Sequence, residues 1–510
     1  MSNQTSENNK RIAKNTLFLY LRMIFLLFVS LYTSRIILAQ LGVVDYGLYN
    51  VVGSLVLMFS FIQGSLSSAT SRFLTYDLGK NDFIALNKTF CMTLNVHLIF
   101  ALIVLFISET IGLWYFYEKM VIPQDRLTAA AIVYQLSNLN AIMAIIVIPY
   151  RSMIIAKEKM SAFAYISIVE AIIKLGIASC LYIGGIDKLI VYGSLLCFSQ
   201  LVVNYIYFNY CRKQFAEVRF HKYWDKKLFY SMFSFSGWSV CSYLSSNFVS
   251  QTFNILLNMF FGPVVNAARA IAYQVQGAVS NFSVSFQVAL NPQIIKNYAV
   301  KDIERVNALV QLSIKVSFSL LLILLAPLLI NVDFVLGLWL KDVPVYSANF
   351  LILIGCISIF SSMANPLAVV AEAANRLKFY NLTTMPFYLM SIPIAYLLLK
   401  LGNSVYVVFL ITLITEFFGF FIKLWIASKI ISINKKQINI LFLKALVCML
   451  IVLLLGSYLK PLIHGLFLSL VSIVLSGVIA ILLVYCLILN IYERKTINRK
   501  ILSYCKASSQ

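Results

Sequence analysis

Basic side chains occur inside long apolar segments of this 510-residue sequence, where charged groups are rare. An ionisable group in hydrocarbon costs at least about 2.5–3.5 kcal/mol, so it must face protein, water or a ligand. Glu109, Glu170 and Glu416 are the acidic residues in clearly comparable positions. An excess of cations over carboxylates favours an anionic ligand, and a guanidinium can bind phosphate through two hydrogen bonds. The basic residues are Arg22, Arg35, Lys174, Arg269, Lys315, Lys423 and Lys444.

Four of these residues are candidates for binding such an anionic ligand, which makes them the predicted substrate-binding residues: Arg22, Arg35, Arg269 and Lys315. Arg22 and Arg35 point about 140° apart on an ideal helix, so together they require a wide cavity or two separate roles. Lys315 lies two turns into its segment and could instead extend to the membrane surface. Lys444 is closer to a segment end, and we expect its long side chain to reach the surface.

The remaining charges form two acid–base combinations that are candidates for ion coupling. Glu170 and Lys174 are four residues apart, the spacing of an ion pair on one helix face. Glu416 and Lys423 are seven apart, which is about two helical turns along one face. Each combination is also consistent with a purely structural ion pair.

Small polar residues recur every four positions in the seventh apolar segment. At helical spacing they form one polar stripe, which could either line a hydrated cavity or pack against a neighbouring helix. The candidate cavity-lining residues are Ser242, Ser246, Ser250 and Asn254, and Asn258 continues the stripe.

The sequence indicates neither a metal site nor a cofactor. Its three histidines, His97, His221 and His464, are far apart and lack the spacing of metal ligands. The nine cysteines include no C-x-x-C pair. We therefore expect catalytic, metal and cofactor sites to be absent.

Composition predicts an all-α integral membrane protein. Hydrophobic residues make up 61% and charged residues 12% of the sequence, and the mean hydropathy is +0.87. Soluble domains are about 45–50% apolar and about 25% charged. Segments of about 20 apolar residues can cross a bilayer as helices. Fourteen are predicted, at 15–39, 46–69, 89–113, 127–150, 161–183, 189–210, 229–258, 264–291, 307–330, 345–370, 378–399, 404–428, 438–459 and 464–491.

The distribution of Lys and Arg over the connecting loops predicts the orientation of the chain. If the N-terminus is cytoplasmic, 28 of the 41 basic residues lie on the cytoplasmic side and 6 on the other. This is a strong positive-inside bias, and it places both termini in the cytoplasm. Because the basic loops would face an anionic leaflet, the net charge of +22 does not indicate nucleic-acid binding.

An internal repeat suggests two related halves. Residues 36–42 (IILAQLG) resemble 256–262 (LLNMFFG), and similar short matches follow at offsets of 217–221. The offset equals six helices, an even number, so the halves form a parallel repeat with the substrate path between them. The predicted domains are a cytoplasmic tail (1–14), a six-helix bundle (15–210), a cytoplasmic linker (211–228), a second six-helix bundle (229–428), helices 13 and 14 (438–491) and a cytoplasmic tail (492–510).

Several motifs resemble a known transporter superfamily. Residues 34–42 (SRIILAQLG) and 45–49 (DYGLY) are similar to the R-x-L-x-x-x-L-G and Y-G-x-Y signature at the first hairpin of O-antigen (Wzx-type) flippases. Residues 268–270 (ARA), 276–279 (QGAV) and 289–292 (ALNP) resemble helix 8 of the wider superfamily. With the helix count and repeat, the whole chain resembles the polysaccharide-transport branch of the multidrug/oligosaccharidyl-lipid/polysaccharide (MOP) flippase superfamily.

This resemblance implies a MATE-like fold and a flippase. The family moves undecaprenyl-pyrophosphate-linked oligosaccharides, such as O-antigen, capsule or exopolysaccharide units, from the cytoplasmic to the periplasmic leaflet by alternating access. Arg35 and Arg269 correspond to arginines that line the cavity and bind pyrophosphate in lipid II flippases. The acidic residue that follows the helix 1 arginine in those flippases is missing after Arg35, which favours polysaccharide cargo over lipid II.

Three alternatives differ in what they require. A cation-coupled multidrug (MATE-type) exporter should carry a carboxylate in helix 1, and 15–39 contain none. A lipid II flippase is the second alternative. A membrane enzyme needs a sizeable outer loop, and the longest outer loops, 114–126 and 331–344, are too short. We therefore expect a transporter of the bacterial inner membrane, without enzyme activity, whose partners are a polyprenyl-pyrophosphate-linked glycan, membrane lipids and a polysaccharide polymerase.

Overall fold

The computed structural model describes most of the chain after residue 59 and scattered positions before it. The described residues are 14–26, 28–30, 32–33, 36–37, 39–41, 45, 48–49, 52, 60–118, 120, 122–182, 187–219, 221, 223–340, 343–459, 465–491, 493–495 and 498.

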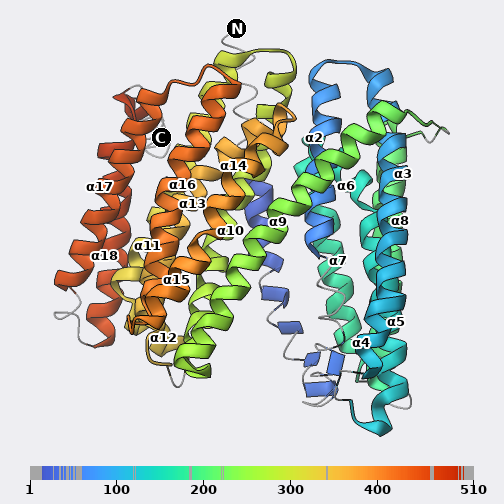
Figure 1. The fold of residues 1–510 in the computed structure, drawn as a ribbon, viewed down its shortest axis with the longest axis horizontal. Coiled ribbons are helices and arrows are strands. Elements are labelled where there is room, and N and C mark those ends of the chain that lie inside the picture. Colours follow the sequence, from blue (N-terminus) through green and yellow to red (C-terminus); the bar gives the residue numbers. More distant parts are fainter. Residues whose placement is uncertain are drawn as a thin grey trace, which may run out of the picture. The chain divides into compact units, whose positions relative to one another are not determined.

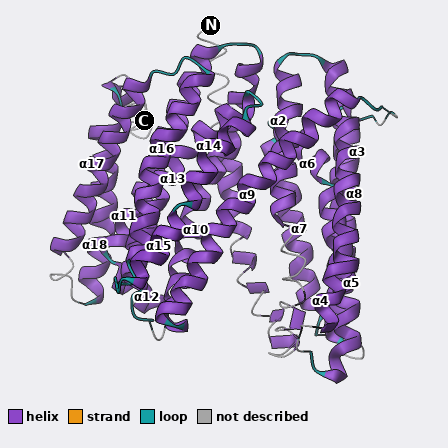
Figure 2. Ribbon diagram, in the orientation of Figure 1, coloured by secondary structure: helices purple, strands orange, loops and turns teal. Residues whose placement is uncertain are grey.

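Helices account for nearly all of the described residues, which include no strand (Figure 2). Two short π-helical segments, η1 (Ser108–Gly112) and η5 (Val484–Ile488), continue longer helices. The α-helices are α2 (Ser60–Gly79), α3 (Phe83–Ile107), α4 (Leu113–Glu118), α5 (Leu127–Ile146), α6 (Ile148–Ala156), α7 (Met160–Cys180), α8 (Lys188–Gln214), α9 (Lys226–Phe261), α10 (Pro263–Ala299), α11 (Ile303–Ile330), α12 (Val332–Trp339), α13 (Ser347–Ala373), α14 (Leu377–Leu389), α15 (Ser391–Lys400), α16 (Val407–Ile430), α17 (Lys435–Leu459) and α18 (Leu466–Leu483).

Within the described residues, ten helical segments are long and apolar enough to cross a membrane. Helices α9 and α10 are also long, with 36 and 37 residues, but their polar side chains keep them out of this set. At 1.5 Å per residue each measures about 55 Å, more than a bilayer needs. The all-helical membrane fold is confirmed, and the count of fourteen crossings stays a prediction.

The first compact unit contains residues 1–244, 288–302 and 372–381. In it α5 packs along α8, α2 along α6, and α3 along α5 (Figure 1). Its core includes Phe90, Met153 and Met160, which are fully buried. Pro149 lies at the start of α6, after a break that follows α5. Proline lacks an N–H donor and its ring clashes with the preceding turn, which explains the break.

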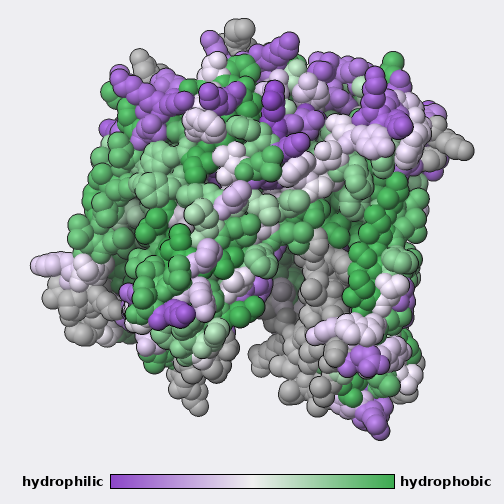
Figure 3. All heavy atoms as spheres, in the orientation of Figure 1, coloured by the Kyte–Doolittle hydropathy of each residue, from purple (hydrophilic) through white to green (hydrophobic). Residues whose placement is uncertain are grey.

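The second compact unit contains residues 245–287, 303–371 and 382–510. Here α11 packs against both α17 and α18 (Figure 1). Hydrophobic side chains cover the visible faces of α17 and α18 along most of their length, and hydrophilic ones gather where α17 begins (Figure 3). This is the pattern expected of helices that face lipid.

Two loops in the structure are shorter than the sequence predicts. The sequence places a cytoplasmic loop at 70–88, but α2 continues to Gly79 and α3 starts at Phe83. The polar residues of this stretch favour a loop by hydropathy, yet buried packing of α2 keeps it helical. Likewise, the predicted loop at 151–160 begins inside α6. Arg72 and Arg151, counted as loop residues, therefore lie on helices.

Candidate anion-binding site

Arg269 lies in the first two turns of α10 and is buried, with 8% of its surface exposed. Its Nη2 donates to the carbonyl oxygen of Ser250 at 3.0 Å and to the Ser250 hydroxyl at 3.1 Å. Its Nη1 donates to Asn254 Oδ1 at 3.3 Å. The guanidinium carbon also lies 4.6 Å from the centre of the Tyr273 ring. We call Arg269, Ser250, Asn254 and Tyr273 the Arg269 cluster.

The polar stripe of α9 explains how a charged group can be held here. Ser250 and Asn254 are one turn apart, so both face the start of α10, which follows α9 after Gly262. Gly262 has φ +80°, a left-handed conformation that glycine adopts at little cost. All the partners are neutral, and among the described residues no carboxylate pairs with Arg269. Among the described residues, the cluster therefore holds a buried cation that no carboxylate compensates.

Arg22 forms a second cationic cluster, in the first unit. Its guanidinium carbon lies 4.5 Å from the centre of the Phe163 ring, and that of Arg151 lies 5.0 Å from the same ring. Arg151 and Glu170 are near enough to Arg22 to act on its charge. The buried Nε of Arg22 has no hydrogen-bond partner among the described residues. A buried donor without a partner is costly, so this group is suited to receive a ligand.

Arg35 and Lys315 are the two other predicted substrate contacts. Arg35 lies outside the described residues. Lys315 lies on α11 and its ammonium pairs with Glu493, at 2.7 and 2.8 Å from the two carboxylate oxygens. Its charge is thus already compensated, unlike that of Arg269.

The candidate ion-coupling residues form two different arrangements. Lys174 and Glu170 make a direct ion pair of 2.6 Å on α7. Glu416 instead accepts a hydrogen bond from the Tyr388 hydroxyl at 3.1 Å, and the Lys423 ammonium lies 5.1 Å from the centre of the Tyr388 ring. Tyr388 thus joins the two charges, a role that hydropathy and spacing do not reveal.

The predicted cavity-lining stripe divides between two roles. The Ser242 hydroxyl donates to Asn381 Oδ1, and Asn381 donates back to the Trp238 carbonyl, so this end of the stripe joins α9 to α14. Ser250 and Asn254 bind Arg269 instead. The side chain of Ser246 lies outside the described residues. The described stripe residues thus bind other protein groups, and the lining of a cavity by this stripe stays a prediction.

Sequence reasoning missed two arginines because it placed them in loops. Arg151 shares the Phe163 ring with Arg22. Arg72 on α2 is 7% exposed and donates to the carbonyl oxygens of Glu372, at 3.1 Å, and Ala373, at 3.0 Å. The aromatic residues near Arg72 in the sequence were the available signal, since arginine stacks on aromatic rings.

Known proteins resemble this chain in fold rather than in sequence. No family model and no curated protein matches the sequence. A crystal structure of a MATE mutant matches 82% of this chain and 97% of its own, at 13% identity and a TM-score of 0.70. An outward-facing multidrug resistance MATE family transporter of the MOP superfamily matches 82% of this chain over 96% of its own length, at 12% identity and a TM-score of 0.68.

A third similar structure is a MOP superfamily transporter from Pyrococcus furiosus Vc1, in which the reverse polarity of the binding pocket suggests a different function. It matches 82% of this chain and 96% of its own, at 12% identity and a TM-score of 0.65. These likenesses confirm the predicted MATE-like fold of MOP superfamily transporters. The polysaccharide branch stays a prediction.

Proposed function

We propose that this chain is a flippase that moves a polyprenyl-pyrophosphate-linked oligosaccharide across the inner membrane by alternating access. The main support is the Arg269 cluster. Its guanidinium is buried, and all of its partners among the described residues are neutral. Such a group attracts an anion, and the planar fork suits phosphate oxygens. Arg22 supplies a second cation. Arg35 is included as a further phosphate-binding residue because it corresponds to an arginine of lipid II flippases.

A cation-coupled multidrug exporter of the same fold is less consistent with these charges. Such an exporter must bind cationic drugs and coupling ions, for which carboxylates are the matching groups. The first predicted span, 15–39, contains no Asp or Glu. The reversed pocket polarity of the Pyrococcus transporter is a precedent for other functions in this fold. A lipid II flippase would share the phosphate chemistry and differs in the cargo glycan.

The test compares Arg269→Ala, Arg269→Lys and the control Arg212→Ala in a strain deleted for this protein. Arg212 is an exposed residue near the end of α8. Losing a two-pronged contact to phosphate costs about 1.5–3 kcal/mol, a loss of cargo affinity of about ten- to a hundredfold. We expect Arg269→Ala to abolish cell-surface glycan, Arg269→Lys to restore part of it, and Arg212→Ala to leave it unchanged.

Normal surface glycan in the Arg269→Ala strain, at normal protein level, would remove the proposed role. Two further measurements separate the alternatives. Increased drug sensitivity of the deletion strain with intact glycan would indicate the multidrug exporter. Arrest of cell-wall synthesis with accumulation of lipid II would indicate the lipid II flippase.

A further inference from the structure

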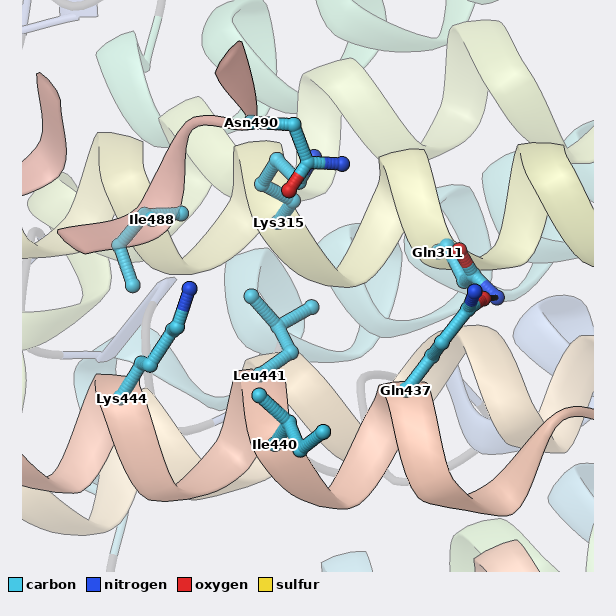
Figure 4. Close-up of a pocket in the computed structure, with 8 residues that line it drawn as sticks. All are labelled: Gln311, Lys315, Gln437, Ile440, Leu441, Lys444, Ile488 and Asn490. Carbon is cyan, nitrogen blue, oxygen red and sulfur yellow. Dashed lines mark hydrogen bonds between the residues drawn. The ribbon is translucent and has the colours of Figure 1, made fainter.

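A pocket lined by both polar and apolar side chains lies between α11, α17 and the segment that follows α18 (Figure 4). Its volume is about 200 Å³. A water molecule occupies about 30 Å³ in the liquid, so the pocket has room for several waters or for a phosphate group. The lining residues are Gln311, Lys315, Gln437, Ile440, Leu441, Lys444, Ile488 and Asn490.

Within the part of the chain that the structure describes, Lys444 is the charged group of this pocket that has no partner. Its ammonium points across the pocket toward the segment that carries Ile488 and Asn490 (Figure 4). Among the described residues, no hydrogen bond or ion pair involves this ammonium. A half-buried cation without a partner is unfavourable, so an anion in the pocket would stabilise it.

Lys315 has a partner, Glu493, which lies in the segment that follows Asn490 at the pocket. Glu493 accepts from Lys315 and, at 2.7 Å, from the backbone N–H of Asn490. Arg494 ties the same segment to the end of η5 by donating to the Leu489 carbonyl at 3.1 Å. Two lysines and one carboxylate leave the pocket with a net charge of +1, and its amide side chains can add N–H donors.

The pocket borders the lipid-facing surface of α17. Ile440, which lines the pocket, is 44% exposed, and Leu443 and Val447 on the same helix are 60% and 46% exposed. Exposed apolar residues along a membrane helix indicate contact with lipid chains. A ligand entering here would therefore place an apolar part against α17 and a polar part in the pocket.

The depth of the pocket matches a phospholipid phosphate. Lys444 lies about 14 Å along α17 from Lys435, on the side predicted to be cytoplasmic. The interfacial layer of a bilayer is about 5–8 Å thick on each side, and a lysine side chain spans several ångströms toward it. Basic pockets between membrane helices on the cytoplasmic side are suited to anionic headgroups.

We propose that this pocket binds the phosphate headgroup of an anionic membrane phospholipid, with Lys444 as its main cation and Glu493 as its competitor for Lys315. The ligand is a resident lipid, distinct from the transported cargo. The carboxylate of Glu493 occupies the position of an anion beside Lys315. Removing its charge should therefore strengthen lipid binding, whereas removing the charge of Lys444 should weaken it.

The experiment titrates the purified full chain, in neutral detergent, with dioleoyl phosphatidylglycerol or dioleoyl phosphatidylcholine, and counts bound lipids by native mass spectrometry. We expect phosphatidylglycerol to be retained in preference to phosphatidylcholine. Lys444→Gln should lose about tenfold or more in affinity, because a charge-assisted hydrogen bond is lost. Lys444→Arg should retain binding, and Glu493→Gln should bind more tightly.

The matched control is Lys436→Gln, which removes an exposed ammonium from the first turn of the same helix. It should leave lipid binding unchanged. Equal phosphatidylglycerol affinity in wild type, Lys444→Gln and Glu493→Gln would overturn the proposal. So would displacement of the lipid by inorganic phosphate at equal concentration, because the site would then be specific for free phosphate. No transport is measured, so the outcome is independent of the proposed flippase activity.

Discussion

At the scale of single residues, Arg126 shows what a guanidinium does when carboxylates do surround it. Its Nε donates to Asp45 at 2.9 Å and its Nη1 to Asp187 at 2.6 Å. The three residues come from three segments on the side predicted to be periplasmic. Two carboxylates compensate the charge of Arg126, which connects these segments. Arg269 has only neutral partners among the described residues. The contrast separates a structural arginine from one suited to bind a ligand.

The Arg126 cluster, made of Arg126, Asp45 and Asp187, predicts an acid-sensitive contact. Partial burial opposes ionisation of Asp187, but hydrogen bonds from Arg126 and from the backbone N–H of Ile190 hold its pKa below the ordinary value. A lowered pKa stabilises the folded chain above the unfolded pKa of about 3.9, and this stabilisation is lost as pH falls through the folded pKa. We expect Asp187→Asn to cost about 1 kcal/mol at pH 7, since the network is partly exposed.

The measurement is thermal unfolding in detergent between pH 7 and pH 3. The difference between wild type and Asp187→Asn should shrink toward the acid end. Asp125→Asn serves as the control, because Asp125 is exposed on the same outer connection. A difference that does not change with pH would show that the charge of Asp187 is unimportant.

At the scale of elements, the end of α2 and the end of α10 approach closely. A Cβ atom on Gly79 would lie 2.7 Å from the Lys296 carbonyl oxygen and 2.8 Å from its Cα. The same end of α10 is fixed by Glu158, which accepts from Gln293 at 2.6 Å and from Lys296 at 2.5 Å. Glu158 is itself buried. These contacts join α2, α10 and the connection between α6 and α7.

This approach predicts opposite effects for two glycine substitutions. Gly79→Ala should destabilise the fold by about 1–3 kcal/mol, because backbone atoms must move apart. Gly176→Ala is the matched control, since no atom lies within 4 Å of its Cβ position inside α7. Alanine there should be neutral or stabilise by up to about 1 kcal/mol. Thermal unfolding measures both, and equal effects would contradict the close approach.

The sequence predicts which segments are helices but not which of their residues meet. Arg269 and the stripe with Ser250 and Asn254 were identified separately, because hydropathy and spacing describe one segment at a time. Their contact depends on the sharp turn at Gly262. Glu158 and Lys296 are in contact although 138 residues separate them, and no local pattern links them. Arg72 was assigned to a loop because polar residues follow it, although it is buried.

At the scale of the whole molecule, the proposed alternating access requires contacts between the two sequence halves to form and break. Inside the first compact unit, the ends of α10 and α13 contact helices from the N-terminal half. The end of α10 is held through Glu158, and the end of α13 through Arg72 and the carbonyl oxygens of Glu372 and Ala373. All of these contacts lie at helix ends that the sequence predicts to be cytoplasmic. In the proposed alternating-access cycle, opening toward the predicted cytoplasmic side requires these bonds to be released.

The last prediction follows from that requirement. Arg72→Gln removes two charge-assisted hydrogen bonds and should weaken the contact by about 2–4 kcal/mol, enough to shift a two-state equilibrium strongly. Hydrogen exchange should rise in peptides covering 293–302 and 372–381 and stay unchanged around Arg126. Lys80→Gln, an exposed residue just after α2, is the control. Exchange that rises equally around Arg126 would indicate general destabilisation. Exchange that rises neither in 293–302 nor in 372–381 would show that Arg72 does not stabilise these helix ends.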